Sequence, residues 1–158
     1  MRGEALRQRH AMLTQLAPDT RGARFARRVA GEAGPSFADL AKLPDWLSVA
    51  PERFRQIAAL AALLKYRAAI DAELSGPRLA RVAEAVGENL LDAACAAEPS
   101  GEYRATTLPP PERLLAEGEA LLEAGLPACF ASRFPRACDD AAARGVAAKA
   151  SAIAEALA

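Results

Sequence analysis

The chain has 158 residues, the length of one ordinary domain, and carries 20 basic and 20 acidic residues. Its zero net charge excludes the strongly basic composition that is typical of nucleic-acid-binding domains. Alanine accounts for 41 residues, whereas valine and isoleucine together number eight. Because alanine favours helices and β-branched residues favour strands, we expect an all-α protein. The predicted architecture is a single compact bundle of six to eight helices over residues 1–158.

The charges are unevenly distributed along the chain. Residues 1–30 contain seven arginines against Glu4 and Asp19, a net charge of +5. Residues 31–158 contain 13 basic and 18 acidic residues, a net charge of −5. The basic segment suits an acidic partner, an anionic membrane, nucleic acid or the acidic remainder of the chain itself. The solvated faces of two amphipathic helices would give the same composition.

Residues 1–34 are expected to form two basic helices. The first covers Gly3–Leu16, and the second covers residues 21–31. In the second helix, residues three and four positions apart share a face. This spacing places Phe25 and Val29 on one stripe and Arg21, Arg24 and Arg28 on another.

Residues 36–97 are expected to form the centre of the bundle. A short helix, Phe37–Leu43, precedes a turn at Pro44–Val49 that holds the only tryptophan, Trp46. We interpret Trp46 as a core residue that closes one end of the helices, because large aromatic side chains bury the most apolar area.

Two longer helices, 51–74 and 77–97, are predicted to form the hairpin on which the other elements pack. The first has two apolar stripes, the second of which ends at Leu74, and a helix with two apolar faces is usually central to its bundle. Gly87 lies inside the second helix, where glycine costs about 1 kcal/mol relative to alanine. We therefore expect a break there.

The remaining residues form a loop and a helical tail. Residues 98–109 are rich in Pro, Ser, Gly and Thr, which predicts a loop. In residues 110–158, a helix opens at Pro110 or Pro111 and ends at Ala124, with Gly125 as a left-handed cap. Three shorter helices are then expected, namely Pro127–Phe134, Pro135–Arg144 and Val146–Ala158. The last of these has few large apolar residues, so we expect it to be frayed or supported by a partner.

The side chains predict no catalytic, metal or cofactor site. His10 is the only histidine, so a nucleophilic triad or a zinc site lacks its partners. Cys95, Cys129 and Cys138 are widely spaced, and we interpret all three as small buried residues. Adjacent carboxylates, such as Asp139-Asp140, point about 100° apart around a helix and do not together hold one metal ion. A non-catalytic role is favoured, although enzymatic activity stays open.

The hydropathy pattern favours a water-soluble protein. The first residues lack the apolar segment of a secretory signal peptide. The longest apolar run, Ile57–Leu64, is eight residues long, whereas a membrane-spanning helix needs about 20. We therefore expect a soluble, reduced protein of the cytoplasm.

One combination of motifs resembles a known family. Trp46-Leu47 precedes an Ala/Leu-rich helix, Ile70 follows, and the run SGPRLARVAEAVGENLL contains Leu79, Val82 and Gly87 at the spacing of that family's hairpin. The later run GEALLEAGLPACFASRFP supplies Gly118, Leu122, Pro127, Arg133 and Pro135. Residues 44–135 thereby resemble the cytoplasmic accessory proteins of bacterial type III secretion sorting platforms. The family's usual Leu-Lys-Leu-Pro ending is represented only by Phe134-Pro135. The resemblance implies a non-catalytic adaptor that links a membrane-embedded ring to cytoplasmic sorting components.

We therefore expect a protein-binding adaptor without a cofactor, whose partner is another protein; the partner's identity and the formation of homo-oligomers stay open. The candidate contact residues are Arg21, Arg24, Arg28, Tyr103 and Arg104. One alternative is a small-molecule-binding domain or an enzyme with a pocket near Trp46, Tyr66 and Cys95. Another is weak binding of nucleic acid or an anionic membrane by the arginine-rich N-terminus.

Overall fold

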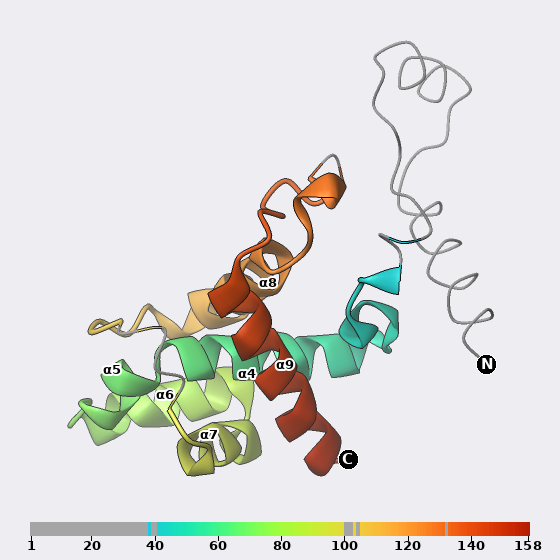
Figure 1. The fold of residues 1–158 in the computed structure, drawn as a ribbon. Coiled ribbons are helices and arrows are strands. Elements are labelled where there is room, and N and C mark those ends of the chain that lie inside the picture. Colours follow the sequence, from blue (N-terminus) through green and yellow to red (C-terminus); the bar gives the residue numbers. More distant parts are fainter. Residues whose placement is uncertain (1–37, 39–40, 100–102, 104, 132) are drawn as a thin grey trace.

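The computed structural model describes residues 38, 41–99, 103, 105–131 and 133–158 (Figure 1). These ranges contain six α-helices, two short 3₁₀ helices and no β-strand, which confirms the predicted all-α class. The predicted N-terminal helices and most of Phe37–Leu43 lie outside them. The elements are η1 (Asp45–Ser48), α4 (Pro51–Lys65), α5 (Arg67–Asp71), α6 (Gly76–Val86), α7 (Glu88–Ala96), α8 (Pro111–Ala124), η2 (Ala128–Phe130) and α9 (Ala141–Ala156).

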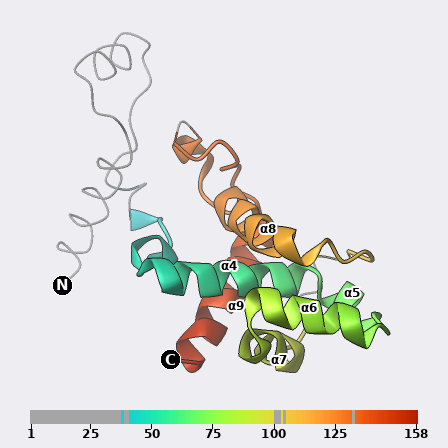
Figure 2. The same cartoon turned by 180° about the vertical axis from the view of Figure 1, so that it is seen from behind.

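Helix α4 is the centre of the fold, as predicted, and α8 and α9 both cross it (Figures 1 and 2). Every residue from Ile57 to Leu64 is at most 4% exposed. This run is apolar on all sides of the helix, which is the pattern of a helix buried all round. The main neighbours of α4 are α8 and α9, with α7 a lesser one. The core therefore depends less on the predicted hairpin than on two helices that are distant in the sequence.

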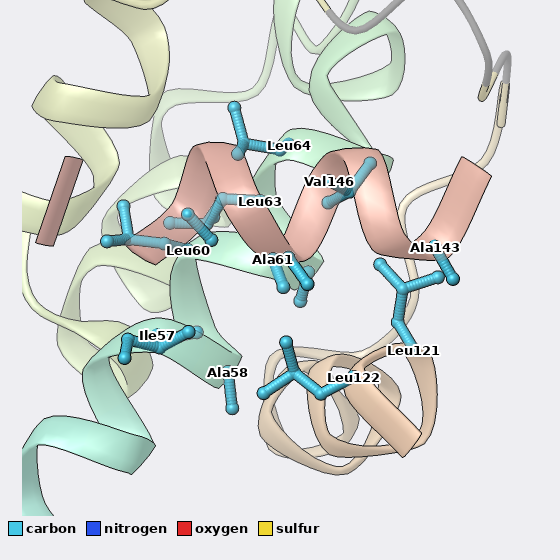
Figure 3. Packing of buried hydrophobic residues seen from close by; sticks show 14 of the residues in the cluster. Ile57, Ala58, Leu60, Ala61, Leu63, Leu64, Leu121, Leu122, Ala143 and Val146 are labelled. Atoms are coloured by element: carbon cyan, nitrogen blue, oxygen red, sulfur yellow. The ribbon is translucent and has the colours of Figure 1, made fainter. Parts of the chain in front are cut away.

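The crossing of α4 and α8 depends on a glycine. Leucines of α4 interdigitate with Leu121 and Leu122 of α8 and with Val146 of α9 (Figure 3). At Gly118 of α8, a Cβ atom would lie only 1.8 Å from the carbonyl oxygen of Ala58 on α4. The two backbones approach this closely only because Gly118 has no side chain.

The predicted continuous helix 51–74 is interrupted. Helix α4 ends at Lys65, Tyr66 has φ −96° and ψ 12°, and the short α5 follows. The interruption places Lys65 and Tyr66 together against Glu117 of α8. Leu74, assigned to an apolar stripe, is 97% exposed because the helix has already ended.

The predicted break at Gly87 is confirmed. Helix α6 ends at Val86, α7 begins at Glu88, and Gly87 between them has φ 101°. Residues with a Cβ atom rarely adopt this backbone conformation, so glycine is the residue that suits the junction.

The prediction of separate helices Pro135–Arg144 and Val146–Ala158 is wrong. Helix α9 runs without interruption through Gly145. It begins where the Asp140 carboxylate accepts hydrogen bonds from the backbone N–H groups of Ala142 (2.9 Å) and Ala143 (3.1 Å). A side-chain cap of this kind contributes about 1 kcal/mol, which offsets the glycine in the helix.

The C-terminal helix is also better packed than predicted. Its inward face is buried against α4 and α8. Small side chains allow this close packing, and the buried residues are Ala143, Val146, Ala147, Ala150 and Ala154. Gly125 also allows close packing, because a Cβ atom added there would lie only 3.1 Å from the backbone nitrogen of Arg144. Its φ of −72° shows that it is not the left-handed cap that the sequence predicted.

The segment between α8 and α9 is mostly irregular, and the predicted helix Pro127–Phe134 is reduced to η2. Phe130 is 1% exposed and fixes this segment to the core. The interpretation of all three cysteines as buried is wrong, because this segment leaves Cys129 and Cys138 exposed, while Cys95 on α7 is half-buried.

Candidate binding groove around Trp46

Trp46 lies at the N-terminal end of α4, as predicted for a core residue. The side chain is on η1, between Pro44 and the start of α4 at Pro51, and is 7% exposed. Its ring centroid is 6.0 Å from that of Phe54, with the ring planes tilted by 43°. Tilted aromatic pairs at this separation contribute about 0.5–1.5 kcal/mol beyond the area they bury. The contact holds the indole against the first turn of α4.

A hollow of about 620 Å³ opens on one side of Trp46. Its apolar wall combines η1, α4, α8 and α9 through Val49, Ile57, Leu122 and Ala147. Side chains of both charges line it as well, namely Lys42, Asp45, Arg53, Asp139, Arg144 and Glu155. The volume lies within the range of about 300–1,000 Å³ that is typical of ligand sites.

A second hollow of about 450 Å³ is formed largely by apolar and aromatic side chains. The walls come from η1, α4, the end of α8 and the segment after it, and include Leu47, Phe54, Leu126 and Phe134. The charged side chains that line it are Glu119, which is exposed, and Glu123. Arg136 lies 3.8 Å from Glu123 and donates its backbone N–H to that carboxylate at 3.1 Å.

Three residues, Trp46, Val49 and Leu122, line both hollows. We call the combined feature the Trp46 groove. Its lining includes five carboxylates and three basic side chains, and with Arg136 beside Glu123 the balance is one negative charge. The arrangement provides two neighbouring apolar hollows with ionic groups around them.

Two polar groups stand out near the groove. Ser151 is one of the residues that line the first hollow, and its buried hydroxyl makes no hydrogen bond within the described residues. Asp139, in the same wall, has a φ of 61°, and its carboxylate accepts from the guanidinium of Arg144. A buried hydroxyl without a partner carries a desolvation cost that a hydrogen-bonding ligand beside it would remove.

The structure does not join Tyr66 and Cys95 to this groove. Neither residue lines either hollow. Tyr66 follows the opposite end of α4, a helix of 15 residues, which is about 22 Å long at 1.5 Å per residue. The pocket predicted from Trp46, Tyr66 and Cys95 together is therefore wrong, and only Trp46 is part of the groove.

Tyr66 belongs instead to an ionic cluster between α4 and α8. The Glu117 carboxylate accepts from Lys65 Nζ at 2.8 Å and from the Tyr66 hydroxyl at 3.0 Å. These two hydrogen bonds hold the pKa of Glu117 below its usual value, and the bond from Lys65 has the larger effect. Burial raises the pKa of Tyr66, and the bond to Glu117 adds to the effect. Burial alone would lower the pKa of Lys65, but its bond to Glu117 and the nearby Tyr66 outweigh it, so this pKa is raised.

Replacing Glu117 with glutamine should flatten the acid side of the pH–stability curve. A carboxyl group whose folded pKa is lowered stabilises the fold above its unfolded value, near 4.5. This contribution is lost as the pH falls through the folded pKa. The Glu117 side chain is 37% exposed, so we expect E117Q to lower the free energy of unfolding at pH 7 by no more than about 1 kcal/mol.

Urea unfolding between pH 3 and pH 7 measures this effect, and E84Q, at an exposed position of α6, is the control. Equal pH dependence of E117Q and E84Q would contradict the assignment. The raised pKa values of Lys65 and Tyr66 act at the alkaline end of the pH–stability curve. The stability that these two groups contribute is present below their unfolded pKa values and is lost as the pH rises through their folded pKa values.

Of the five predicted contact residues, the described ranges contain Tyr103. Its ring packs against the core, and its hydroxyl donates to the Asp140 carboxylate at 3.4 Å, next to the start of α9. Leu108 in the same loop is buried, and its carbonyl accepts from Arg78. The described part of the loop is thus attached to the body. Arg21, Arg24, Arg28 and Arg104 lie outside the described residues, and their role stays a prediction.

Within the described ranges, no three His, Cys, Asp or Glu side chains are placed to hold a metal ion. Burial raises the pKa of the Cys95 thiol, so its reactive thiolate form is disfavoured. The groove itself offers shape, apolar surface and charge for binding.

Over the same ranges, no helix combines the length and apolar character that crossing a membrane requires.

Comparisons with protein-family models, curated proteins and solved structures yield no match to this chain.

Proposed function

We propose that this chain is a non-catalytic protein-binding adaptor and that the Trp46 groove is its binding site. The observation that carries the proposal is the pair of hollows that share Trp46, Val49 and Leu122 as walls. Amphipathic helices bind such grooves by inserting large apolar side chains spaced three or four residues apart. The occupant is then a helical segment with two apolar anchors one turn apart.

The charge of the groove indicates the charge that the partner's helical segment should carry. Glu119 and Glu123 line the second hollow, and the balance over both hollows is acidic. Complementary charge increases the association rate and disfavours wrong partners more than it adds affinity. We therefore propose a basic amphipathic helix of another protein as the partner segment.

The resemblance to sorting-platform accessory proteins gives this proposal a biological setting. In that setting the adaptor links a membrane-embedded secretion ring to cytoplasmic sorting components, and the basic helix belongs to one of them. The adaptor proposal depends on the groove and does not require this particular assembly.

The experiment is a cross-linked affinity capture from the source organism, with the wild type and two variants compared. In V49D a charge is placed in the wall shared by both hollows. L74D carries the same change at a side chain that is 97% exposed and remote from the groove. We expect a partner that the wild type and L74D capture and V49D does not, with cross-links to residues of the groove.

Capture that is equal for V49D and L74D would contradict the groove as the site, provided that circular dichroism shows both variants folded. Recovery of secretion components among groove-dependent partners would support the sorting-platform setting. Groove-dependent recovery of other proteins would support the adaptor and reject that setting.

A small-molecule site is the second candidate, and the Ser151 hydroxyl favours it. The hydroxyl is buried and without a partner among the described residues, and its residue lines a hollow of about 620 Å³. Native mass spectrometry of the purified protein tests the idea. A bound compound that is retained by the wild type and lost from S151A would support a ligand site, and an unliganded wild type would reject it.

A further inference from the structure

We infer that residues 21–31 of this chain occupy its own Trp46 groove and that a partner must displace them. This inference rests on the proposed function of the groove and adds its regulation. It gives the arginine-rich segment an intramolecular role in place of a surface for nucleic acid or membranes.

The first argument is the position of the tether. The chain leaves the undescribed N-terminal residues at the groove itself, since Lys42 lines the first hollow and Leu43 is 4% exposed. Gly31 precedes Lys42 by 11 positions, and an extended chain of that length reaches roughly 36–40 Å. A tether this short gives a local concentration on the order of millimolar, which favours even a weak contact.

The second argument is the match of apolar side chains. Phe25 and Val29 are the large apolar residues of the segment and lie four positions apart, which places them on one face of a helix. The groove offers two hollows that have Trp46, Val49 and Leu122 in common in their lining. The aromatic walls Phe54 and Phe134 of the second hollow suit Phe25.

The third argument is charge. The segment contains four arginines and no acidic residue between positions 21 and 31. The second hollow is lined by Glu119, which is exposed, and by Glu123, which is paired with Arg136, and residues 31–158 as a whole carry a net charge of −5. Docking therefore places opposite charges together, and the contact should weaken as salt is added.

The test uses the full chain and its only tryptophan, which lies in the groove. The variant F25A/V29A removes both anchors, and R24E/R28E reverses two charges. L6A/L13A, in the preceding segment, is the matched control. If the segment covers the groove, both test variants should shift Trp46 emission to the red and increase its quenching by acrylamide. The wild type and L6A/L13A should stay equally protected, and added salt should reduce their protection.

A second measurement locates the segment directly. A photoreactive phenylalanine analogue at position 25 should cross-link within the same molecule to Leu126, Phe134 or Phe54. Cross-links between molecules, or protection that disappears on dilution, would identify a second copy as the occupant and overturn the intramolecular contact. Unchanged Trp46 emission and quenching in both test variants would overturn it as well.

The failure of this inference is distinguishable from the failure of the proposed function. If V49D abolishes partner capture but the N-terminal variants leave Trp46 unchanged, the adaptor stands and the self-contact is rejected. If both the adaptor function and the self-contact are correct, F25A/V29A should bind the partner more tightly than the wild type. The competing segment then no longer reduces the fraction of molecules whose groove is open.

Discussion

Replacing Gly118 with alanine should lower the free energy of unfolding by about 3 kcal/mol or more. The added Cβ atom would lie 1.8 Å from the carbonyl oxygen of Ala58 and 2.6 Å from its carbonyl carbon. Both atoms belong to the backbone of α4, so no side-chain rotation relieves the clash, and α8 must move away from α4. That movement separates the helices that make the largest contact in the core.

Urea unfolding followed by circular dichroism measures the loss, and G76A is the matched control. Gly76 lies at the start of α6, and a methyl group added there would have no atom within 4 Å. We expect G76A to change the free energy of unfolding by no more than about 0.5–1 kcal/mol. A G118A variant as stable as G76A would contradict the close backbone approach of α4 and α8 at Gly118. Because α8 also carries Leu122 and Glu119, G118A should impair the Trp46 groove as well.

Replacing Phe130 with alanine should cost about 3–5 kcal/mol. The side chain is 1% exposed, so its removal leaves a cavity in addition to the lost burial. The buried ring of Phe130 fixes the segment after α8 to the core. The backbone bonds that its carbonyl oxygen accepts from Arg133 and Phe134, both at 2.9 Å, are kept in the alanine variant and do not replace that anchor. We therefore expect the segment to loosen and the second hollow, which includes Phe134, to change shape.

The control for F130A is F54A, which removes the same kind of side chain from a half-buried position in the groove wall. Its cost in unfolding free energy should be clearly smaller, since less of the ring is removed from water. Partner binding, by contrast, should be reduced in F54A even though its fold is retained. An F130A protein that unfolds no more easily than F54A would show that Phe130 does not anchor the segment.

Much of the local structure follows from the sequence. The start of α8 follows from Pro111, the break after α6 follows from Gly87, and the burial of α4 follows from its apolar run Ile57–Leu64. Each of these depends on backbone geometry or hydrophobicity within a few residues, so the amino-acid order is sufficient. Asp140 carries a comparable signal for the start of α9, but its adjacency to Asp139 also suggests one half of a carboxylate pair, and this obscures the cap.

The groove was only partly predictable. Trp46, between two prolines and followed by apolar residues, indicated a buried aromatic side chain at a helix end. Nothing in the order of residues showed that Ser151 and Arg144 of α9 or Glu119 of α8 would face it. These positions are about 70–105 residues away along the chain, and side chains so distant meet only through tertiary packing.

The sequence by itself determined that this protein is helical, where several of its helices begin and end, and that the helix beginning at Pro51 lies at the centre. Only the tertiary structure decided that α8 and α9 are the principal neighbours of α4, that Gly118 and Gly125 serve close backbone approach, and that an alanine-rich C-terminal helix is buried. The physical reason is that helix formation depends on neighbouring residues, whereas packing depends on the distances between backbones. A small residue gives the same helical signal whether it faces water or another helix.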